Sequence, residues 1–289
     1  MPDPNNSFYF WSGCVISLIS MCVGCTYLYR LVTAECNKKV AIWTLLFLLF
    51  TPASFFFGIC YTEALFLCLC VMFFYYLRKG NYVVAAIIGA LAAFTRSLGV
   101  LLAVPYFAEW LDCEMTVKQP VKKKILRLLP IFIITGGTLA YLGINYFIYG
   151  DPLKFTVYQL HWGQKFSFFI DNIADIGVRA FTWDDLITSL VMWLPEFLVM
   201  LGTVVIFAFA GGNKLRPSYL GYIMVYIVFA AAPSWLLSGV RYFAVLFPVF
   251  ILFGKFAYKH KVAGGALLIL SAAAMLLYSW GFVNGLQIM

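Results

Sequence analysis

The sequence predicts an all-α polytopic membrane protein of about ten transmembrane helices, and its composition and its charge-free stretches both support this. Of its 289 residues, 64% are hydrophobic and 11% are charged, whereas soluble domains carry about 25% charged residues. Several charge-free stretches reach the roughly 20 residues that a helix needs to cross the hydrocarbon core. They are residues 4–29, 40–62, 128–150, 217–240 and 262–289. Because lipid offers the backbone no hydrogen-bond partners, these stretches must be helical.

We expect ten spans within a single transmembrane domain, residues 1–289. The spans lie at about 8–29, 40–60, 63–77, 81–95, 98–110, 128–149, 186–210, 218–237, 242–258 and 262–283. No linker, low-complexity tract or internal repeat separates them. The first apolar stretch is not preceded by a positively charged leader, so we expect it to remain in the mature protein.

The basic residues are distributed unevenly between the two sides that alternating spans create. Fifteen lie in loops on one side, and five lie on the other: Arg96, Lys154, Lys165, Arg179 and Arg241. Since Lys and Arg are enriched in cytoplasmic loops, we expect the first side to be cytoplasmic and loop 150–185 to lie outside. The net charge of +8 therefore indicates topology rather than nucleic-acid binding, because the basic residues separate apolar stretches.

Three charged residues border spans that are unusually short. Glu63, Arg96 and Arg241 are followed by only 14, 12 and 13 uncharged residues before the next charge. Such helices cover about 20 Å of a core that is about 30 Å thick, so we expect these charges at or below the outer membrane surface. A charge at that depth usually faces a wet cavity or a partner. The pattern predicts one shared polar pocket, although each charge could instead mark a span boundary.

The residues around these charges suit a phosphorylated lipid. Tyr61 precedes Glu63 at one hairpin top, and Ser97 follows Arg96 at a second. Arginine beside hydroxyl groups and glycine favours phosphate through charge-assisted hydrogen bonds. Upstream, Pro52 lies inside the second apolar stretch, where it should kink the helix.

The outer loop is expected to contain an interfacial helix. After the turn signal at Gly150-Asp151, aromatic residues recur at helical intervals, which predicts one aromatic stripe lying along the membrane interface. The stripe consists of Phe155, Tyr158, Trp162, Phe166 and Phe169. Its role is either membrane anchorage or a wall for a lipid-linked or sugar substrate, with His161 and Trp162 near the opening.

The sequence gives little indication of a metal centre or of disulfides. The cysteines lie mostly inside spans, where they behave as small apolar residues, and no Cys/His set has zinc-ligand spacing. Asp184-Asp185 could hold a divalent cation, but adjacent acids before a span also suit a helix N-terminus. We expect no resident metal.

Five segments together resemble the GPI mannosyltransferase 2 (PIG-V) family and its bacterial relatives, which have the GT-C fold. The segments cover about two thirds of the chain in family order: Thr51-Pro52-Ala53-Ser54, Tyr61-Thr62-Glu63, Phe94-Thr95-Arg96-Ser97, Gly150-Asp151-Pro152-Leu153 with His161-Trp162, and Arg241-Tyr242-Phe243. The resemblance implies an inverting mannosyltransferase that uses a polyprenyl or dolichyl phosphate sugar and a glycolipid or glycan acceptor at the outer face. It also implies that Glu63 lines the catalytic cavity and that Arg96 and Arg241 bind the carrier phosphate. Asp151 belongs to one of the matching segments and is a further candidate for the substrate site.

One family feature has no counterpart in this sequence. Family members begin with an additional span and an outer loop whose Trp-Asp pair supplies the expected catalytic base. Glu63 is the nearest replacement here, with Asp151 and Asp184-Asp185 as rivals, and we expect none to replace that loop fully. A lipid or solute transporter and a non-catalytic homologue therefore remain alternatives. The compact chain favours a bacterial cell membrane, with the endoplasmic reticulum membrane as the alternative.

Overall fold

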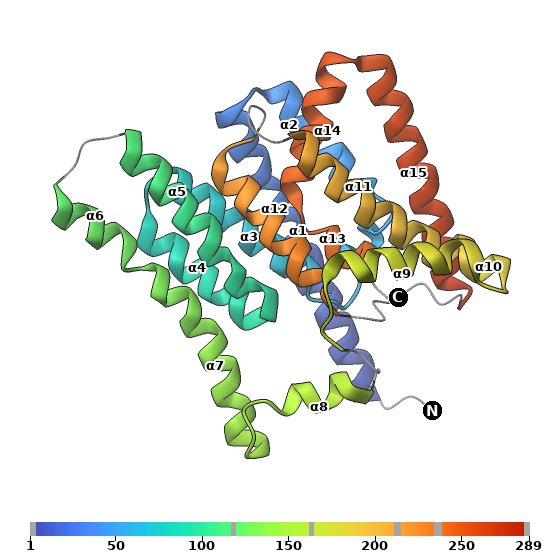
Figure 1. The fold of residues 1–289 in the computed structure, drawn as a ribbon, viewed down its shortest axis with the longest axis horizontal. Helices are drawn as coiled ribbons and strands as arrows, with labels where there is room; N and C mark the ends of the chain where they lie inside the picture. Colours follow the sequence, from blue (N-terminus) through green and yellow to red (C-terminus); the bar gives the residue numbers. More distant parts are fainter. Residues whose placement is uncertain (1–3, 117–119, 162–164, 211–214, 234–238, 286–289) are drawn as a thin grey trace.

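The computed structural model describes residues 4–116, 120–161, 165–210, 215–233 and 239–285 (Figure 1). Within these ranges the regular structure is helical, apart from one isolated antiparallel bridge between Phe166 and Pro233. In the first half of the chain the helices are α1 (Pro4–Glu35), α2 (Lys38–Leu49), α3 (Glu63–Arg78), α4 (Tyr82–Thr95), α5 (Ala103–Thr116), α6 (Val121–Leu128) and α7 (Ile131–Tyr149). In the second half they are α8 (Lys154–His161), α9 (Phe169–Thr182), α10 (Leu186–Thr188), α11 (Leu194–Ala210), α12 (Pro217–Ala230), α13 (Gly239–Phe243), α14 (Phe247–Lys259) and α15 (Lys261–Val283).

Four helical segments in the described residues are long and apolar enough to cross a membrane unaided. They are Ser7–Glu35, Val121–Tyr149, Leu186–Phe209 and Lys261–Val283, while Tyr82–Thr95 and Pro217–Ala230 are shorter apolar helices. Each of the ten predicted spans contains helix. The prediction of an all-α polytopic membrane protein is confirmed.

The predicted span 40–60 is wrong as a single kinked helix. Helix α2 ends at Leu49, and a short 3-10 helix, Ser54–Gly58, follows after a turn. The reason is local, since Pro52 lacks an amide hydrogen and disfavours helical backbone in the preceding residue. The chain therefore leaves the helix instead of bending within it.

Helix α3 lies inside the bundle and fixes the arrangement of the site. Its residues are buried on all sides, including Phe66, Cys70, Phe73 and Phe74, and it packs between α1 and α4. A helix that is apolar all round belongs in the interior of a protein or membrane. With 16 residues, α3 is only about 24 Å long, so its two ends place charged residues near the two membrane surfaces.

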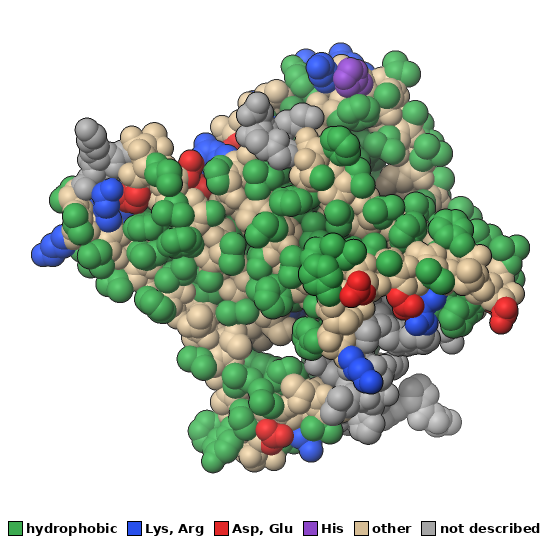
Figure 2. All heavy atoms as spheres, viewed as in Figure 1, with side chains coloured by type: hydrophobic (Ala, Val, Ile, Leu, Met, Phe, Trp, Pro, Cys, Tyr) green, Lys and Arg blue, Asp and Glu red, His purple; other side chains and the backbone are tan. Residues whose placement is uncertain are grey.

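Helices α7 and α15 have the opposite character and extend along the outside of the bundle (Figure 1). In the 18-residue apolar stretches of Val121–Tyr149 and Lys261–Val283, only 17% and 11% of the stretch is buried. Hydrophobic side chains cover most of the face shown in Figure 2. Phe147 and Leu277 are 86% and 71% exposed. In water so much apolar surface would cause association, so lipid must cover these helices.

The predicted aromatic helix of loop 150–185 is divided into two. Helix α8 ends at His161 and α9 begins at Phe169. Between them, Ser167 N donates a hydrogen bond to Ala232 O, and Phe166 forms the bridge with Pro233. Because Phe166 and Ser167 pair in extended conformation with residues 232–233, the helix does not continue through them. Phe166 and Phe169 therefore do not extend the aromatic stripe that begins at Phe155. Tyr158 and Trp162 have side chains outside the described residues.

Candidate functional site

A buried ion cluster joins Glu63, Arg96 and Arg241. Arg96 Nη1 donates a hydrogen bond to Glu63 Oε1 at 2.6 Å, and Arg241 Nε lies 3.1 Å from the same oxygen. The side chains are 2%, 13% and 14% exposed, respectively. The structure therefore brings together the three charges that border the short spans.

Three different helix ends place these side chains. Glu63 is the first residue of α3, where its negative charge also favours the positive end of the helix dipole. Arg96 directly follows α4 in extended backbone, and Arg241 lies in the five-residue helix α13. The cluster thus forms where the start of α3 and the end of α4 lie side by side, away from the turn that joins the two helices, and α13 adds Arg241 to it.

Aromatic rings flank both guanidinium groups. Arg241 Cζ lies 4.7 Å from the ring centroid of Tyr61 and 5.6 Å from that of Phe56. Tyr242 lies between the two arginines, 4.9 Å from Arg96 Cζ and 5.3 Å from Arg241 Cζ. Such contacts orient a guanidinium and stabilise it by about 0.5–2 kcal/mol. Tyr61 is 37% exposed, so it marks the side from which the cluster can be reached.

The cluster has one positive charge in excess, and its hydrogen bonding is incomplete. Glu63 Oε2 is buried without a hydrogen-bond partner among the described residues, whereas Arg241 Nε is ion-paired with Glu63 Oε1 at 3.1 Å without forming a hydrogen bond. Buried polar groups in folded proteins nearly always have hydrogen-bond partners, and a hydroxyl group is suited to donate to Glu63 Oε2. A phosphate group fits the excess charge, because arginine binds its oxygens with charge-assisted, forked hydrogen bonds.

A fourth charged residue, Glu196, supports the cluster and was missed by sequence analysis. It is fully buried in α11, and both carboxylate oxygens lie 2.8 Å from Gly239 N, at the start of α13. A Cβ on residue 239 would lie 2.3 Å from Glu196 Oε2, so glycine is needed for this approach. Helix α13 is too short to be stable alone, and Glu196 fixes the end that leads to Arg241. An acid inside a long apolar span was the available signal.

The other predicted site residues do not all join the cluster. Ser97 follows Arg96 but is exposed at the start of a 3-10 helix. Asp151 accepts a hydrogen bond from Leu153 N within the turn that leads from α7 to α8, and it therefore has a local structural role. The His161 side chain and Trp162 lie outside the described residues.

Asp185 acts as a helix cap. It accepts hydrogen bonds from Ile187 N at 3.2 Å and from Thr188 N at 3.1 Å, and Thr188 Oγ1 also donates to it. The bonds from Thr188 lower the pKa of Asp185 below its ordinary value. The helix N-terminus alternative is confirmed for Asp185, which is the N-cap of α10. Among the residues that the structure describes, no group of three His, Cys, Asp or Glu side chains is placed to hold a metal.

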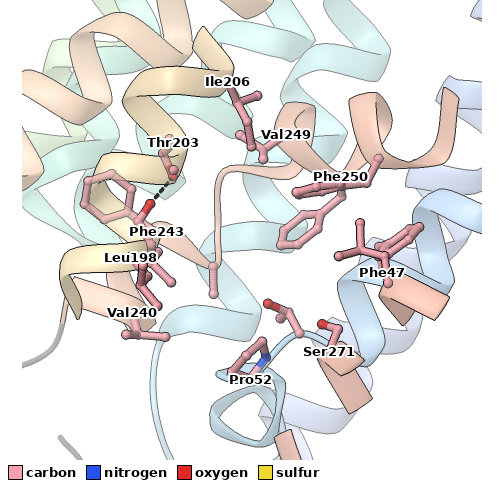
Figure 3. Close-up of a pocket in the computed structure, with 16 residues that line it drawn as sticks. Phe47, Pro52, Leu198, Thr203, Ile206, Val240, Phe243, Val249, Phe250 and Ser271 are labelled. Carbon is pink, nitrogen blue, oxygen red and sulfur yellow. Dashed lines mark hydrogen bonds between the residues drawn. The ribbon is translucent and has the colours of Figure 1, made fainter. Parts of the chain in front are cut away.

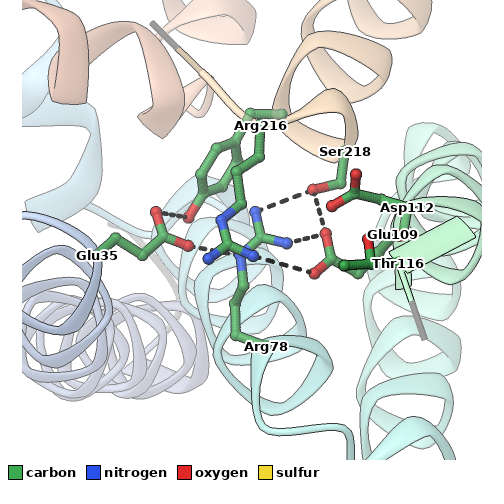
Figure 4. Close-up of polar contacts among 8 residues, drawn as sticks. Glu35, Arg78, Glu109, Asp112, Thr116, Arg216 and Ser218 are labelled. Atoms are coloured by element: carbon green, nitrogen blue, oxygen red, sulfur yellow. Dashed lines mark hydrogen bonds and ion pairs between the residues drawn. The ribbon is translucent and has the colours of Figure 1, made fainter. Parts of the chain in front are cut away.

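A second buried ion network occupies the other end of α3 (Figure 4). Arg78 Nε donates to Glu35 Oε1 at 2.5 Å, Arg78 Nη2 donates to Ser218 Oγ at 2.9 Å, and Arg78 Nη1 contacts Glu109. Arg216 lies 3.7 Å from Glu109. These contacts tie α1, α3, α5 and α12 together. Because all three Arg78 nitrogens have partners, this network is suited to holding the helices and not to binding a ligand.

An apolar cavity of about 230 Å³ lies beside α13 (Figure 3). Val240 and Phe243, which flank Arg241 and Tyr242 in sequence, line this cavity. Helices α2, α11, α14 and α15 and the turn after α2 supply most of the remaining wall, mainly with Phe and aliphatic side chains, and Thr51, Thr203 and Ser271 add polar groups. Helix α13 thus contributes residues to both the charged cluster and the apolar cavity.

Comparison with solved structures finds a similar fold in the crystal structure of ArnT from Cupriavidus metallidurans bound to undecaprenyl phosphate. The TM-score is 0.53 and the sequence identity 13%, over 89% of this chain and 49% of that chain. The chain therefore spans about half the length of that protein. No protein-family model matches the sequence, and no curated protein matches it. The structural likeness confirms the predicted GT-C-like fold, while membership of the PIG-V family stays a prediction.

Proposed function

We propose that this protein is a membrane glycosyltransferase that takes a sugar from a polyprenyl or dolichyl phosphate carrier, with mannose as the sugar. The observation that carries the proposal is the buried cluster of Glu63, Arg96 and Arg241, with its excess positive charge and with one Glu63 oxygen that has no hydrogen-bond partner among the described residues. The similarity to a GT-C-fold protein that binds undecaprenyl phosphate supports it. The proposed site faces the non-cytoplasmic side, in agreement with the distribution of basic residues.

In the proposed complex, Arg96 and Arg241 bind the carrier phosphate. Each guanidinium contacts Glu63 Oε1 through one nitrogen, so a phosphate beside the carboxylate would be bound by the other N–H groups of both arginines. The apolar cavity beside α13 supports the assignment, because a lipid phosphate brings an apolar chain that needs a dry wall close to its headgroup.

Glu63 is the proposed proton acceptor. The acceptor hydroxyl attacks the anomeric carbon, the bond from that carbon to the phosphate oxygen breaks, and the lipid phosphate leaves with the electron pair. The hydroxyl proton passes to the carboxylate. Arg96 and Arg241 contact Oε1 of Glu63, whereas Oε2 has no hydrogen-bond partner among the described residues. In the proposed mechanism Oε1 anchors the arginines and Oε2 receives the proton.

The test separates carrier binding from chemistry in reconstituted protein. Polyprenyl phosphate binding should weaken by about 2–5 kcal/mol in Arg96→Ala and Arg241→Ala, as for loss of a buried charged partner. Arg96→Lys should also weaken it, because lysine lacks the forked geometry. Arg30→Ala, at an exposed arginine beyond the site, is the control. If both cluster variants bind polyprenyl phosphate like the parent, the phosphate role is refuted.

The chemistry is tested with radiolabelled polyprenyl phosphate mannose and a membrane glycolipid extract. Glu63→Gln should retain carrier binding and lose mannosyl transfer. Transfer that survives Glu63→Gln would remove the base role from Glu63. Movement of the intact labelled lipid across the bilayer, with no bond cleaved, would identify a transporter instead.

A further inference from the structure

A second pocket, with both basic and apolar side chains in its lining, lies at the end of the bundle where α3 turns into α4. It has a volume of about 340 Å³ and is lined by Gly80, Asn81 and the first turn of α4 on one side, and by α6 on the other. Gly80 has φ of 72°, a conformation that favours glycine, and this tight turn exposes the start of α4. The pocket is remote from Glu63, since it lies beyond the opposite end of α3.

Two cationic side chains of α6, Lys123 and Arg127, line this pocket. Lys123 is exposed, and Arg127 is held with its guanidinium 5.7 Å from the ring of Tyr82. Glu114 pairs with Lys124 and Arg127 at 3.4 and 3.5 Å. Helix α6 carries four basic residues, Lys122, Lys123, Lys124 and Arg127. The single negative charge of Glu114 does not neutralise these four positive charges, so α6 keeps a net positive charge.

The α4 wall of the pocket also favours an anion. Asn81 precedes α4 but makes no side-chain hydrogen bond to it. The N–H groups of the first turn have no acceptors within their own helix, and the helix dipole adds positive potential there. The pocket therefore combines backbone donors, a lysine and an arginine.

Apolar side chains border the same pocket. Val83 and Val84 on α4 are 54% and 41% exposed, and Leu126 on α6 is 57% exposed. These side chains line the pocket together with the basic residues. Helix α6 therefore has the composition of a segment lying at the membrane interface, with basic groups at headgroup level and apolar groups toward the acyl chains.

We infer that this pocket binds the phosphate headgroup of an anionic phospholipid in the leaflet opposite the glycosyltransferase site. A free phosphate would satisfy the basic groups alone, but only a lipid also covers the apolar side chains at the rim. Basic pockets between transmembrane helices on the cytoplasmic side suit anionic headgroups. The inference does not depend on the proposed transferase activity.

The test uses the delipidated protein in detergent, titrated with fluorescent phosphatidylglycerol in mixed micelles. Each basic residue near an anionic lipid contributes about 1 kcal/mol, or roughly fivefold in affinity. Lys123→Gln, an exposed change that should not affect folding, is expected to weaken binding about fivefold, and Lys123→Gln with Arg127→Gln about 25-fold. The matched control, Lys259→Gln with Lys261→Gln, removes the same charge from exposed sites on the same predicted side and should bind like the parent.

Four results would overturn the inference. They are unchanged phosphatidylglycerol binding in the pocket variants, an equal loss in the control, equal binding of phosphatidylcholine, and full competition by millimolar inorganic phosphate. The first two would show that the pocket has no particular role. The third would exclude a charged headgroup as the determinant, and the fourth would identify free phosphate as the ligand.

Discussion

The contact between Glu196 and Gly239 should control carrier binding although neither residue belongs to the charged cluster. Removing the carboxylate in Glu196→Ala leaves Gly239 N, now bonded at 2.8 Å to both oxygens, without its acceptor. A buried unsatisfied N–H group costs about 1–3 kcal/mol, which is enough to release a five-residue helix. Arg241 would then lose its fixed position beside Glu63.

The expected consequence is a loss of polyprenyl phosphate affinity. Losing a buried charged partner costs about 2–5 kcal/mol, and 2 kcal/mol corresponds to about 30-fold in affinity. Glu196→Gln keeps an oxygen that can accept from Gly239 N, so it should retain most of the binding. Rescue by glutamine would separate positioning of Arg241 from a general effect of the charge.

A second variant reaches the same contact from the opposite side. Gly239→Ala would place a Cβ 2.3 Å from both Glu196 Oε2 and Met200 Cε, so the carboxylate must move away. Overpacking of this kind costs about 1–3 kcal/mol. Gly143→Ala on α7 is the matched control, because a Cβ there meets nothing within 4 Å and Gly143 does not line the apolar cavity.

Affinity for polyprenyl phosphate is measured by thermophoresis, and thermal unfolding of each variant is followed in parallel. Glu196→Ala and Gly239→Ala should both bind weakly, and combining them should cost less than the sum, since both break one contact. If Glu196→Ala is folded and binds polyprenyl phosphate as tightly as the parent, the positioning role is refuted.

Three further predictions concern topology, stability and pH. In a cysteine-free background, an impermeant thiol reagent added from outside should label a cysteine at position Lys165 and not one at Lys123, and labelling of the latter would reverse the topology. Arg78→Ala should destabilise the protein by about 3–5 kcal/mol in thermal unfolding, because it leaves two carboxylates buried without their partner, whereas exposed Arg30→Ala should change little. The hydrogen bonds of the Asp185 carboxylate lower its pKa in the folded state. The carboxylate therefore contributes its full stabilisation of the folded state at pH values above its unfolded-state pKa of about 4, and this contribution is lost as the pH falls through its folded-state pKa. The Tm difference between the parent and Asp185→Ala should therefore be constant near neutral pH and shrink in acid, and a difference that grows in acid would contradict the sign.

The sequence by itself determined the class of the protein and indicated three charged residues that the structure brings together. Charge-free stretches of about 20 residues can only be helices in lipid, so the all-α membrane fold followed from composition. The charge-free stretches that follow Glu63, Arg96 and Arg241 are too short to cross the hydrocarbon core, because each helical residue adds a fixed length. This predicted that the three charges lie at or below the membrane surface. Local chemistry also predicted the turn at Gly150-Asp151, which ends α7.

Tertiary structure decided which of those residues meet. Nothing in the spacing shows that Glu196 and Gly239, 43 positions apart, form hydrogen bonds, or that Arg78 is held by carboxylates from two other helices. The aromatic periodicity of loop 150–185 predicted one helix, but pairing of Ser167 with Ala232 interrupts it. Local propensity is weak compared with long-range contacts, and a contact between distant segments exists only once the helices have packed.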